Sequence, residues 1–150
     1  MVTPTPDKKG FPPAVNTSFS ENGGYLAVRS SKCPNMMLPI AKNLDDAGFE
    51  GIELISGSHL KKTVRELKED PWERVRLISK IITKTPLRLI AGRVNTFEYN
   101  PPSMYRLFVE RMFANGIREA RISDEWNDHE GWKFRVGECH RAGMQSILNL

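Results

Sequence analysis

Long apolar runs are absent from the sequence, and cysteine is scarce, with two residues in 150. No apolar run approaches the ~20 residues that a transmembrane helix needs, so we expect no membrane span. No apolar core follows Lys8 and Lys9, so we expect no signal peptide. Cys33 and Cys139 lack metal-type spacing, which indicates a reducing compartment, either the cytoplasm or an organelle matrix.

Several motifs of catalysis and binding are also missing. The sequence has no Ser-His-Asp arrangement, no P-loop and no paired-cysteine motif, and Gly23-Gly24 alone does not indicate phosphate binding. The net charge is +4, but the basic residues are spread along the chain and interleaved with Asp and Glu. We therefore expect no nucleic-acid partner, because such an interface needs a clustered basic face.

What is present is the composition of one globular domain. Hydrophobic residues make up 39% of the chain and charged residues 27%, which is typical of soluble globular proteins. A length of 150 residues supports a single core. Residues 1–13 contain four prolines and little to bury, so we expect a mobile leader before a domain that spans residues 14–150.

A unit of helix, glycine and strand recurs along this domain. In the first copy, apolar residues recur at the spacing of one helix face between Met37 and Ala47, and Gly48 supplies a left-handed stop. From Phe49 to Leu54 the spacing of the apolar residues falls toward two, which is typical of a short strand. Asn115-Gly116 and Ala142-Gly143 mark two further copies.

The full pattern predicts five strands separated by four helical segments. The strands are expected at residues 14–19, 51–55, 87–91, 117–122 and 144–148. The helical segments are expected at residues 37–47, 59–82, 107–114 and 136–141, the second made of two pieces, 59–67 and 71–82. This α/β alternation indicates parallel strands, in a doubly wound sheet or part of a (β/α)8 barrel.

Two helices carry further signals. Asp70, Pro71 and Glu73 predict a helix start with a capping box. Leu107, Phe108, Met112 and Phe113 form an apolar stripe that is expected to face the sheet.

In parallel α/β folds, ligands bind at the carboxyl ends of the strands. Glu21 and Asp124 follow the first and fourth strands and are candidates to hold a divalent cation, with Arg93 nearby for an anionic substrate. The alternative is that all three are solvated loop charges. His59 is either a base or, more commonly, a surface histidine at a helix start, and His140 is expected to point outward.

Several segments resemble, in unbroken order, the carboxyltransferase domain of biotin-dependent enzymes such as pyruvate carboxylase, the oxaloacetate decarboxylase alpha subunit and the transcarboxylase central subunit. The most specific is Glu69-Asp70-Pro71-Trp72-Glu73-Arg74. It is joined by residues 37–49, Thr85-Pro86-Leu87, Asn115-Gly116-Ile117 and residues 124–128. The wider superfamily is that of 3-hydroxy-3-methylglutaryl-CoA lyase. The resemblance implies a partial (β/α)8 barrel, with residues 14–150 forming its amino-terminal half.

The resemblance also implies a site. Its members use a divalent metal (Zn, Mn or Co) and a biotin carried by a partner domain. Glu21 matches their metal-binding Asp, whereas Ser20 and Gly24 replace the Arg and Gln of the first-strand motif. Arg93 stands one position later than the arginine that binds the substrate carboxylate. Asn95, Asp124, Asn127 and Asp128 match, and the family's lysine and His-x-His ligands lie beyond the fifth strand.

Three hypotheses remain open. The chain is part of a carboxyltransferase barrel that is inactive alone, or a non-catalytic binding or scaffold module whose open strand edges another chain covers, or a different superfamily lyase acting on another small acid. Retention of Asp124, Asn127 and Asp128 favours the first, and the replacements at Ser20 and Gly24 favour the second. A biotin carrier protein is an expected partner of the first.

Overall fold

Five parallel strands form one sheet in which each strand lies beside the next one in the sequence. The computed structural model describes residues 17–18, 34–92, 101–123 and 126–149. The strands are β1 (Thr17–Ser18), β2 (Ile52–Ile55), β3 (Leu87–Ile90), β4 (Glu119–Ser123) and β5 (Gln145–Asn149). The order of the described strands never reverses, so they form no switch point of the doubly wound kind, and their arrangement is that of a partial (β/α)8 barrel.

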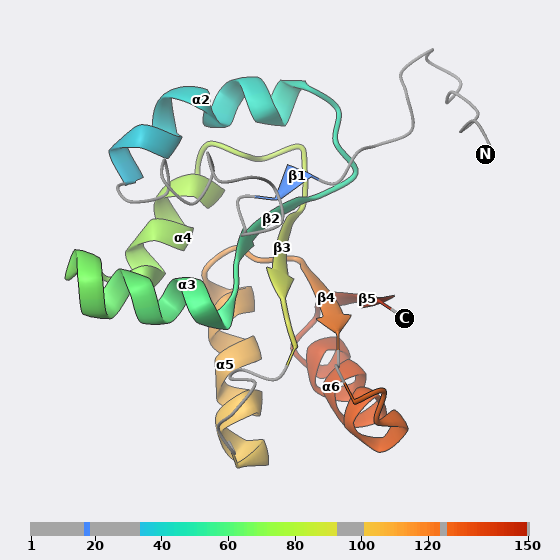
Figure 1. Ribbon diagram of the computed structural model, residues 1–150. Helices are drawn as coiled ribbons and strands as arrows, with labels where there is room; N and C mark the ends of the chain where they lie inside the picture. The colour runs from blue at the N-terminus through green and yellow to red at the C-terminus, as the bar shows by residue number, and fades with distance from the viewer. Residues whose placement is uncertain (1–16, 19–33, 93–100, 124–125, 150) are drawn as a thin grey trace, which may run out of the picture.

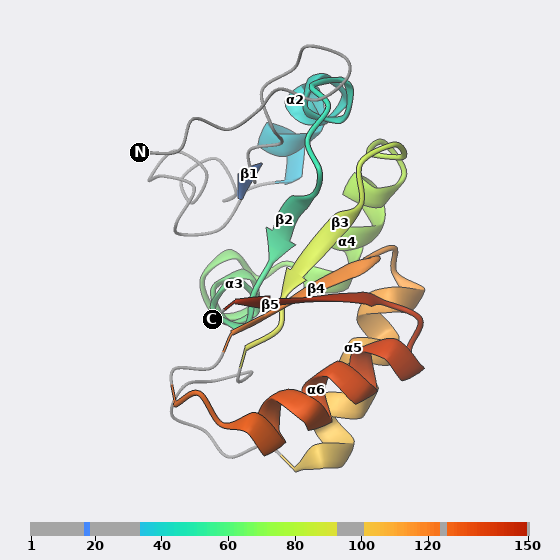
Figure 2. The ribbon, with the colours of Figure 1, turned by 90° about the vertical axis from the view of Figure 1, so that its right-hand side faces the viewer.

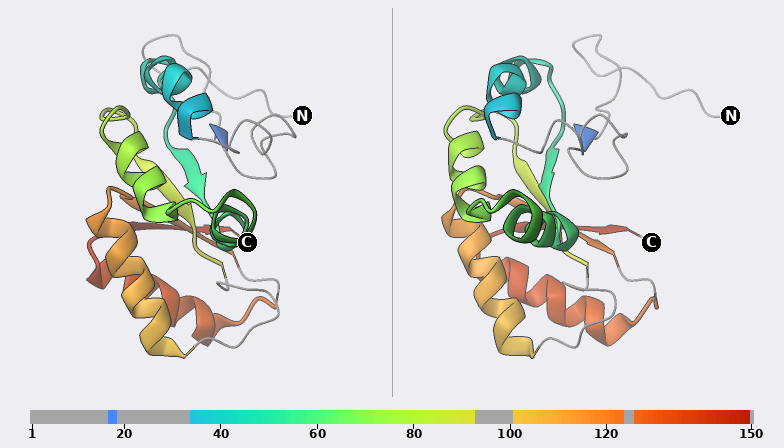
Figure 3. Two further views of the ribbon diagram at one scale, coloured as in Figure 1. Left: turned by 90° about the vertical axis from the view of Figure 1, so that its left-hand side faces the viewer. Right: turned by 60° about the vertical axis from the view of Figure 1, so that its left-hand side comes forward.

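Helices fill the connections between the strands, as the sequence predicted (Figure 1). They are α2 (Pro34–Asp46), α3 (Gly57–Lys62), the π-helical segment η2 (Thr63–Leu67), α4 (Pro71–Ser79), α5 (Pro102–Ala114) and α6 (His129–Arg141). Figure 3 shows α2, α4, α5 and α6 following one another around the outer side of the curved sheet. The sheet therefore has a helix-covered convex face and a concave face.

The register explains which residues fill the core between the sheet and the helices. Leu87 and Leu89 on β3 alternate with Arg88, and Ala120 and Ile122 on β4 are fully buried with them. Residues two apart point to the same face of a strand, so these apolar side chains face the helices. Arg88 is in register with Glu53 and Glu119 and points with them to the concave face.

The three glycines that were expected to end helices have positive φ angles, which confirms the repeated unit. The φ angle is +78° at Gly48, +114° at Gly116 and +93° at Gly143. At Gly116 a side chain is also excluded by space, because a Cβ atom would lie 2.5 Å from Cβ of Ser79. Each glycine turns the chain from a helix on the outside into the next strand.

The start of α4 is confirmed in part. The Asp70 carboxylate accepts a hydrogen bond from the backbone N–H of Trp72 at 2.9 Å, and Pro71 opens the helix. The expected capping box is wrong, since the Glu73 carboxylate accepts from Nε of Arg76 at 2.8 Å instead. The helix ends at Ser79, before the Ile82 end that periodicity predicted.

The apolar stripe predicted on α5 is confirmed at Met112, Phe108 and Phe113, which are buried or pack against the core, and is wrong at Leu107. Leu107 is 49% exposed, while Tyr105, Val109 and Met112 are the buried residues of this helix. The spacing of four and three residues selects one helix face, and the tyrosine ring occupies it because its polar hydroxyl lies 3.8 Å from Sγ of Cys139.

Two predictions fall outside the described residues. They are the leader at residues 1–13 and most of the first strand, of which the structure describes Thr17–Ser18. Among the described helices, none has the length and apolar character needed to cross a membrane.

A buried carboxylate joins the end of α2 to the loop before β3. Asp45 is 3% exposed, and its oxygens accept hydrogen bonds from the backbone N–H groups of Thr83, Lys84 and Thr85 at 2.9, 3.0 and 2.8 Å. Burial raises the pKa of Asp45, but these hydrogen bonds lower it by more, so its pKa lies below 3.8. The carboxylate holds the loop in the position from which β3 starts.

Replacing this carboxylate by an amide is expected to destabilise the fold. Asp45→Asn exchanges an oxygen acceptor for a donor that faces backbone N–H groups, and the loss is about 2 kcal/mol in the free energy of unfolding by urea. Because the folded-state pKa is lowered, the stabilisation is present above pH 4 and is lost as the pH falls through the folded-state value. The difference between the two proteins should therefore be constant near neutral pH and shrink in acid.

The neighbouring Asp46 supplies the matched control. Asp46 is exposed and pairs with Lys42 at 3.1 Å and with Lys84, so Asp46→Asn should change stability much less than Asp45→Asn does. Equal losses in the two variants would show that the Asp45 hydrogen bonds do not stabilise the loop.

Candidate functional site

The candidate site lies at the carboxyl ends of the parallel strands. In Figure 2 the arrowheads of β2 and β3 point toward the side of the sheet on which α3 lies. The residues that follow each strand on this side are the ones that a ligand at the mouth of the sheet would meet. Four of the five predicted site residues, Glu21, Arg93, Asn95 and Asp124, lie outside the described residues, so their positions stay predictions.

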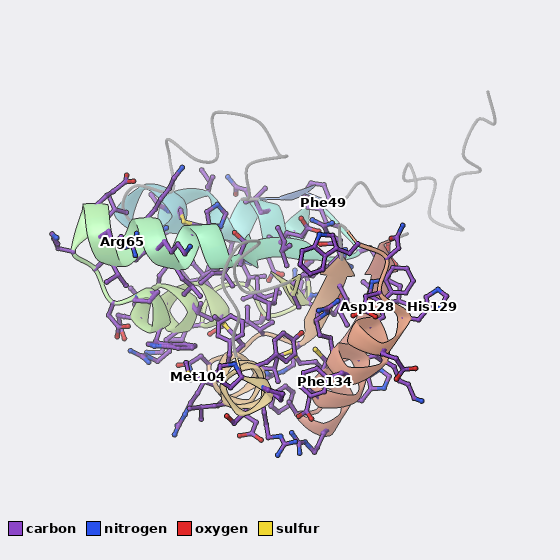
Figure 4. The ribbon with its side chains drawn as sticks, turned by 60° about the horizontal axis from the view of Figure 1, so that its bottom comes forward. Phe49, Arg65, Met104, Asp128, His129 and Phe134 are labelled. Atoms are coloured by element: carbon purple, nitrogen blue, oxygen red, sulfur yellow. The ribbon has the colours of Figure 1, made fainter. Side chains whose placement is uncertain are left out.

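The fifth, Asn127, lies in the connection from β4 to α6. Its φ angle is +50°, a left-handed conformation that asparagine tolerates better than most residues, and it is exposed. Asp128 follows as the N-cap of α6, and Figure 4 shows Asp128 and His129 at the start of that helix. The chain thus turns at Asn127, just after the carboxyl end of β4.

A buried arginine of α6, Arg135, lies close to Asp128. A Cβ atom at Gly131 would lie 2.7 Å from Oδ2 of Asp128 and 3.2 Å from Nη2 of Arg135, so both charged groups approach the same point on α6. Arg135 is 7% exposed. The glycine leaves the space in which the carboxylate and the guanidinium group come near each other. The sequence analysis did not single out Arg135.

Gly92 occupies the position at which the resemblance expects an arginine. A Cβ atom at Gly92 would lie 3.2 Å from the backbone oxygen of Ser123 and 3.3 Å from its Oγ. These are tight contacts, so the ends of β3 and β4 approach too closely here for a larger side chain without movement of Ser123. Ala91 still pairs with the sheet, its N–H donating to the Arg121 oxygen at 2.7 Å.

His59 is buried rather than on the surface. It lies in the first turn of α3, where its backbone N–H donates to Oγ of Ser56, and it is 6% exposed. The expectation of a surface histidine is wrong, because α3 folds back against the carboxyl end of β2. His140, in contrast, is exposed as predicted.

Charged pairs lie on the concave face of the sheet, toward the amino-terminal ends of the strands. Arg88 on β3 binds Glu119 on β4, with Nε and Nη2 at 2.8 and 2.7 Å from Oε2. Arg121 on β4 reaches across β3 to Glu53 on β2 and pairs with both of its oxygens. The Arg88 side chain is 1% exposed and that of Glu53 5%. Desolvated guanidinium and carboxylate groups thus lie side by side on three strands.

The sequence analysis missed these four residues, although a signal was present. Glu53, Arg88 and Arg121 each interrupt an apolar strand at a position that alternates with buried residues. A charged residue in a buried strand needs an opposite charge nearby.

The described residues do not contain a group of three or more metal-ligating side chains. The buried carboxylates on the strands, Glu53 and Glu119, are held by arginines. The part of the chain that the structure describes therefore does not by itself fit a divalent metal. Nor does it offer a reactive thiol, because burial raises the pKa of the Cys139 thiol.

Removing one partner of an ion pair on the concave face is expected to lower the free energy of unfolding more than removing both partners does. Arg88→Met leaves the Glu119 carboxylate buried without its guanidinium partner, which should lower the free energy of unfolding by about 3–5 kcal/mol. Arg88→Met combined with Glu119→Met removes both charges and should recover most of that loss. Urea unfolding followed by circular dichroism measures both values.

Lys42→Met is the control for loss of an ion pair at the surface. The Lys42 side chain is 66% exposed, and its pair with Asp46 should contribute less than about 1 kcal/mol. If the double variant is as unstable as Arg88→Met alone, the effect comes from lost packing of the arginine and not from an unpaired charge.

The comparisons with known proteins agree with this geometry. No family model matches the sequence. The chain is 34% identical over 133 residues to a pyruvate carboxylase subunit of Methanocaldococcus jannaschii, and the match covers 87% of this chain and 23% of that protein. It is 36% identical over 113 residues to the 2-oxoglutarate carboxylase large subunit of Hydrogenobacter thermophilus, covering 73% and 17%.

A solved structure shows the same fold. The carboxyl transferase domain of Rhizobium etli pyruvate carboxylase, solved with 3-bromopyruvate, superposes with a TM-score of 0.78 over 92% of this chain and 24% of that one, at 21% identity. The chain spans about a quarter of the length of the relatives that match it over most of its residues. Sequence similarity, strand order and superposition lead to one conclusion: this chain is a homologue of one part of the carboxyltransferase domain of pyruvate carboxylase, with the fold of the corresponding portion of its (β/α)8 barrel.

Proposed function

We propose that this chain is part of a barrel that transfers a carboxyl group between biotin and a keto acid, and that its 150 residues alone do not catalyse the transfer. The observation that carries the proposal is the 34% identity to a pyruvate carboxylase subunit over 133 residues. Pyruvate and 2-oxoglutarate appear in the names of the relatives, so a 2-keto acid is the substrate class.

In this proposal the keto acid binds at the carboxyl ends of the strands. Arg93 and Asn95 after β3, and Asp124 and Asn127 after β4, contact its carboxylate and keto groups. Glu21 after β1 is the metal ligand, with Asp124 as the second carboxylate. A divalent metal supplies polarisation of the keto oxygen when it is bound. The amide of Asn127, exposed at the mouth, orients the substrate by hydrogen bonding.

Two features support the absence of activity in the isolated chain. Gly92 lies against Ser123 at the position where the resemblance expects the substrate-binding arginine. Within the described residues, the carboxylates of β2 and β4 are already paired with arginines, which leaves no third metal ligand. Both the anion clamp and the metal site therefore need groups from elsewhere.

The proposal includes partners. β1 and β5 stand at the two ends of the strand order, and each pairs with a single neighbour among the described strands. Another chain or domain is expected to pair with these edges, because an exposed parallel edge invites further strand pairing. A biotin carrier protein or domain would bring the carboxyl group to the mouth. The scarcity of cysteine favours a cytoplasmic location.

The second candidate function is a non-catalytic binding or scaffold module built from the same domain. The replacements that favour it are Ser20 and Gly24 in the first-strand motif. In this case the partner chain still completes the sheet, but the assembled barrel does not bind a keto acid.

The purified chain is expected not to decarboxylate oxaloacetate when free biotin and Mn²⁺, Co²⁺ or Zn²⁺ are added. Release of CO2 should equal that of a blank containing only the metal, because the isolated chain lacks the full ligand set. Turnover above the blank that is lost in Glu21→Gln but kept in the exposed variant Glu50→Gln would overturn the proposal.

Supplying the missing part of the barrel separates the two candidates. We expect the chain to co-purify with a polypeptide holding the rest of the carboxyltransferase domain of the Methanocaldococcus jannaschii relative, and the pair to decarboxylate oxaloacetate above the metal blank. A stable pair without activity supports the scaffold module. Failure to associate, measured by size-exclusion chromatography with light scattering, contradicts both.

A further inference from the structure

A pocket opens at the amino-terminal end of the sheet, opposite the candidate site. Its volume is about 610 Å³, within the range of ligand-binding cavities. It lies between the carboxyl-terminal ends of α4 and α5, beside the loop that leads to β3. Its polar and charged lining residues are Arg76, Ser79, Lys80, Thr83, Lys84, Thr85, Asn115 and Arg118.

The lining of this pocket carries charge of one sign. Arg76, Lys80, Lys84 and Arg118 line it, and among the described residues no carboxylate does. Two of the cations are neutralised at its rim, since Arg76 pairs with Asp70 and Glu73, and Lys84 pairs with Asp46. Lys80 and Arg118 have no carboxylate partner among the described residues, so two uncompensated positive charges remain.

The carbonyl groups at the helix ends accept hydrogen bonds from some of these cationic donors, but not from all of them. The carboxyl-terminal carbonyl groups of a helix carry partial negative charge and attract cations. Nη1 of Arg118 donates to the backbone oxygens of Phe113 and Ile117 at 2.8 and 3.0 Å, and its guanidinium group stacks over the Phe113 ring at 4.5 Å. Within the described residues its Nε and Nη2 donate to no acceptor. Lys80 makes no side-chain hydrogen bond in the same part of the chain.

The wall of the pocket is held in place before any ligand arrives. Nη1 of Arg76 donates to Oδ1 of Asn115 at 3.0 Å, and Oγ of Ser79 donates to the Asn115 backbone oxygen at 3.1 Å. Asp45 fixes the opposite wall through the backbone of Thr83 to Thr85. Cationic groups on fixed walls bind anions without a large ordering cost.

We propose that this pocket binds a small molecule with at least two negative charges, phosphates or carboxylates, through Lys80, Lys84 and Arg118. The Nε and Nη2 donors of Arg118 suit the planar fork of a carboxylate or phosphate oxygen pair. Lys80 at the end of α4 supplies the second charge from the other side. Lys84, 65% exposed at the rim, can exchange its Asp46 partner for the ligand at little cost.

Titration of the full chain with inorganic pyrophosphate and with citrate, at constant ionic strength, tests the proposal and separates phosphate from carboxylate ligands. We expect saturable 1:1 binding of one or both by calorimetry, with amide NMR shifts at residues 79–85 and 114–118. Lys80→Gln with Arg118→Gln should weaken binding about tenfold or more, since each lost charge contact weakens it several-fold.

The control removes the same charge elsewhere. Arg65→Gln with Lys133→Gln changes two exposed cations on η2 and α6, and Figure 4 shows Arg65 far from α6. This control should bind like the unchanged chain. Because Arg118 also caps α5, Lys80→Gln alone is a second test that leaves the cap intact and should weaken binding several-fold. Equal weakening in the control, no effect of Lys80→Gln, or no saturable binding of either anion would overturn the proposal.

Discussion

The constraint on which the structure depends is the desolvation of charge on the concave face of the sheet. Arg88 with Glu119, and Arg121 with Glu53, place two guanidinium groups and two carboxylates among three parallel strands. Burying such groups costs several kcal/mol each unless opposite charges meet with good geometry. Slipping any of the three strands by one residue would move one partner to the helix-covered face. The pairs therefore select one register.

That register in turn determines what the mouth of the sheet can present. Gly92 follows Ile90 by two residues and continues the concave face, directly against Ser123. A Cβ atom at Gly92 would need Ser123 to move by a few tenths of an ångström. A chain related to carboxyltransferases thus has a glycine at the position where the resemblance expects an arginine. The same sheet geometry that stabilises the fold limits its chemistry.

The amino-terminal end of the sheet is held together by hydrogen bonds to the backbone and by close packing at a glycine. There, Asp45 binds three backbone N–H groups, Gly116 lies against Ser79, and the ends of α4 and α5 leave a pocket whose charged lining residues, in the described part of the chain, are all cations. In a parallel barrel this end is the one usually devoted to stability. Its uncompensated charges at Lys80 and Arg118 set it apart from a purely structural end.

The order of elements could be read from the sequence because it is local. Apolar spacing around Met37, the glycine stops at Gly48, Gly116 and Gly143, and the Asp70-Pro71 helix start each depend on neighbours within a few residues, and all were confirmed. In the predicted stripe of α5, Met112 is buried and Phe108 and Phe113 pack against the core, but Leu107 is exposed, because the exact limits of the buried face depend on what packs against the helix. The burial of His59 and the approach of Arg135 to Asp128 could not be read from local patterns, and the ion pairs across β2, β3 and β4 join residues up to 68 positions apart. Only the tertiary structure could decide them, since charge pairing across strands depends on distances in space that local sequence patterns do not encode.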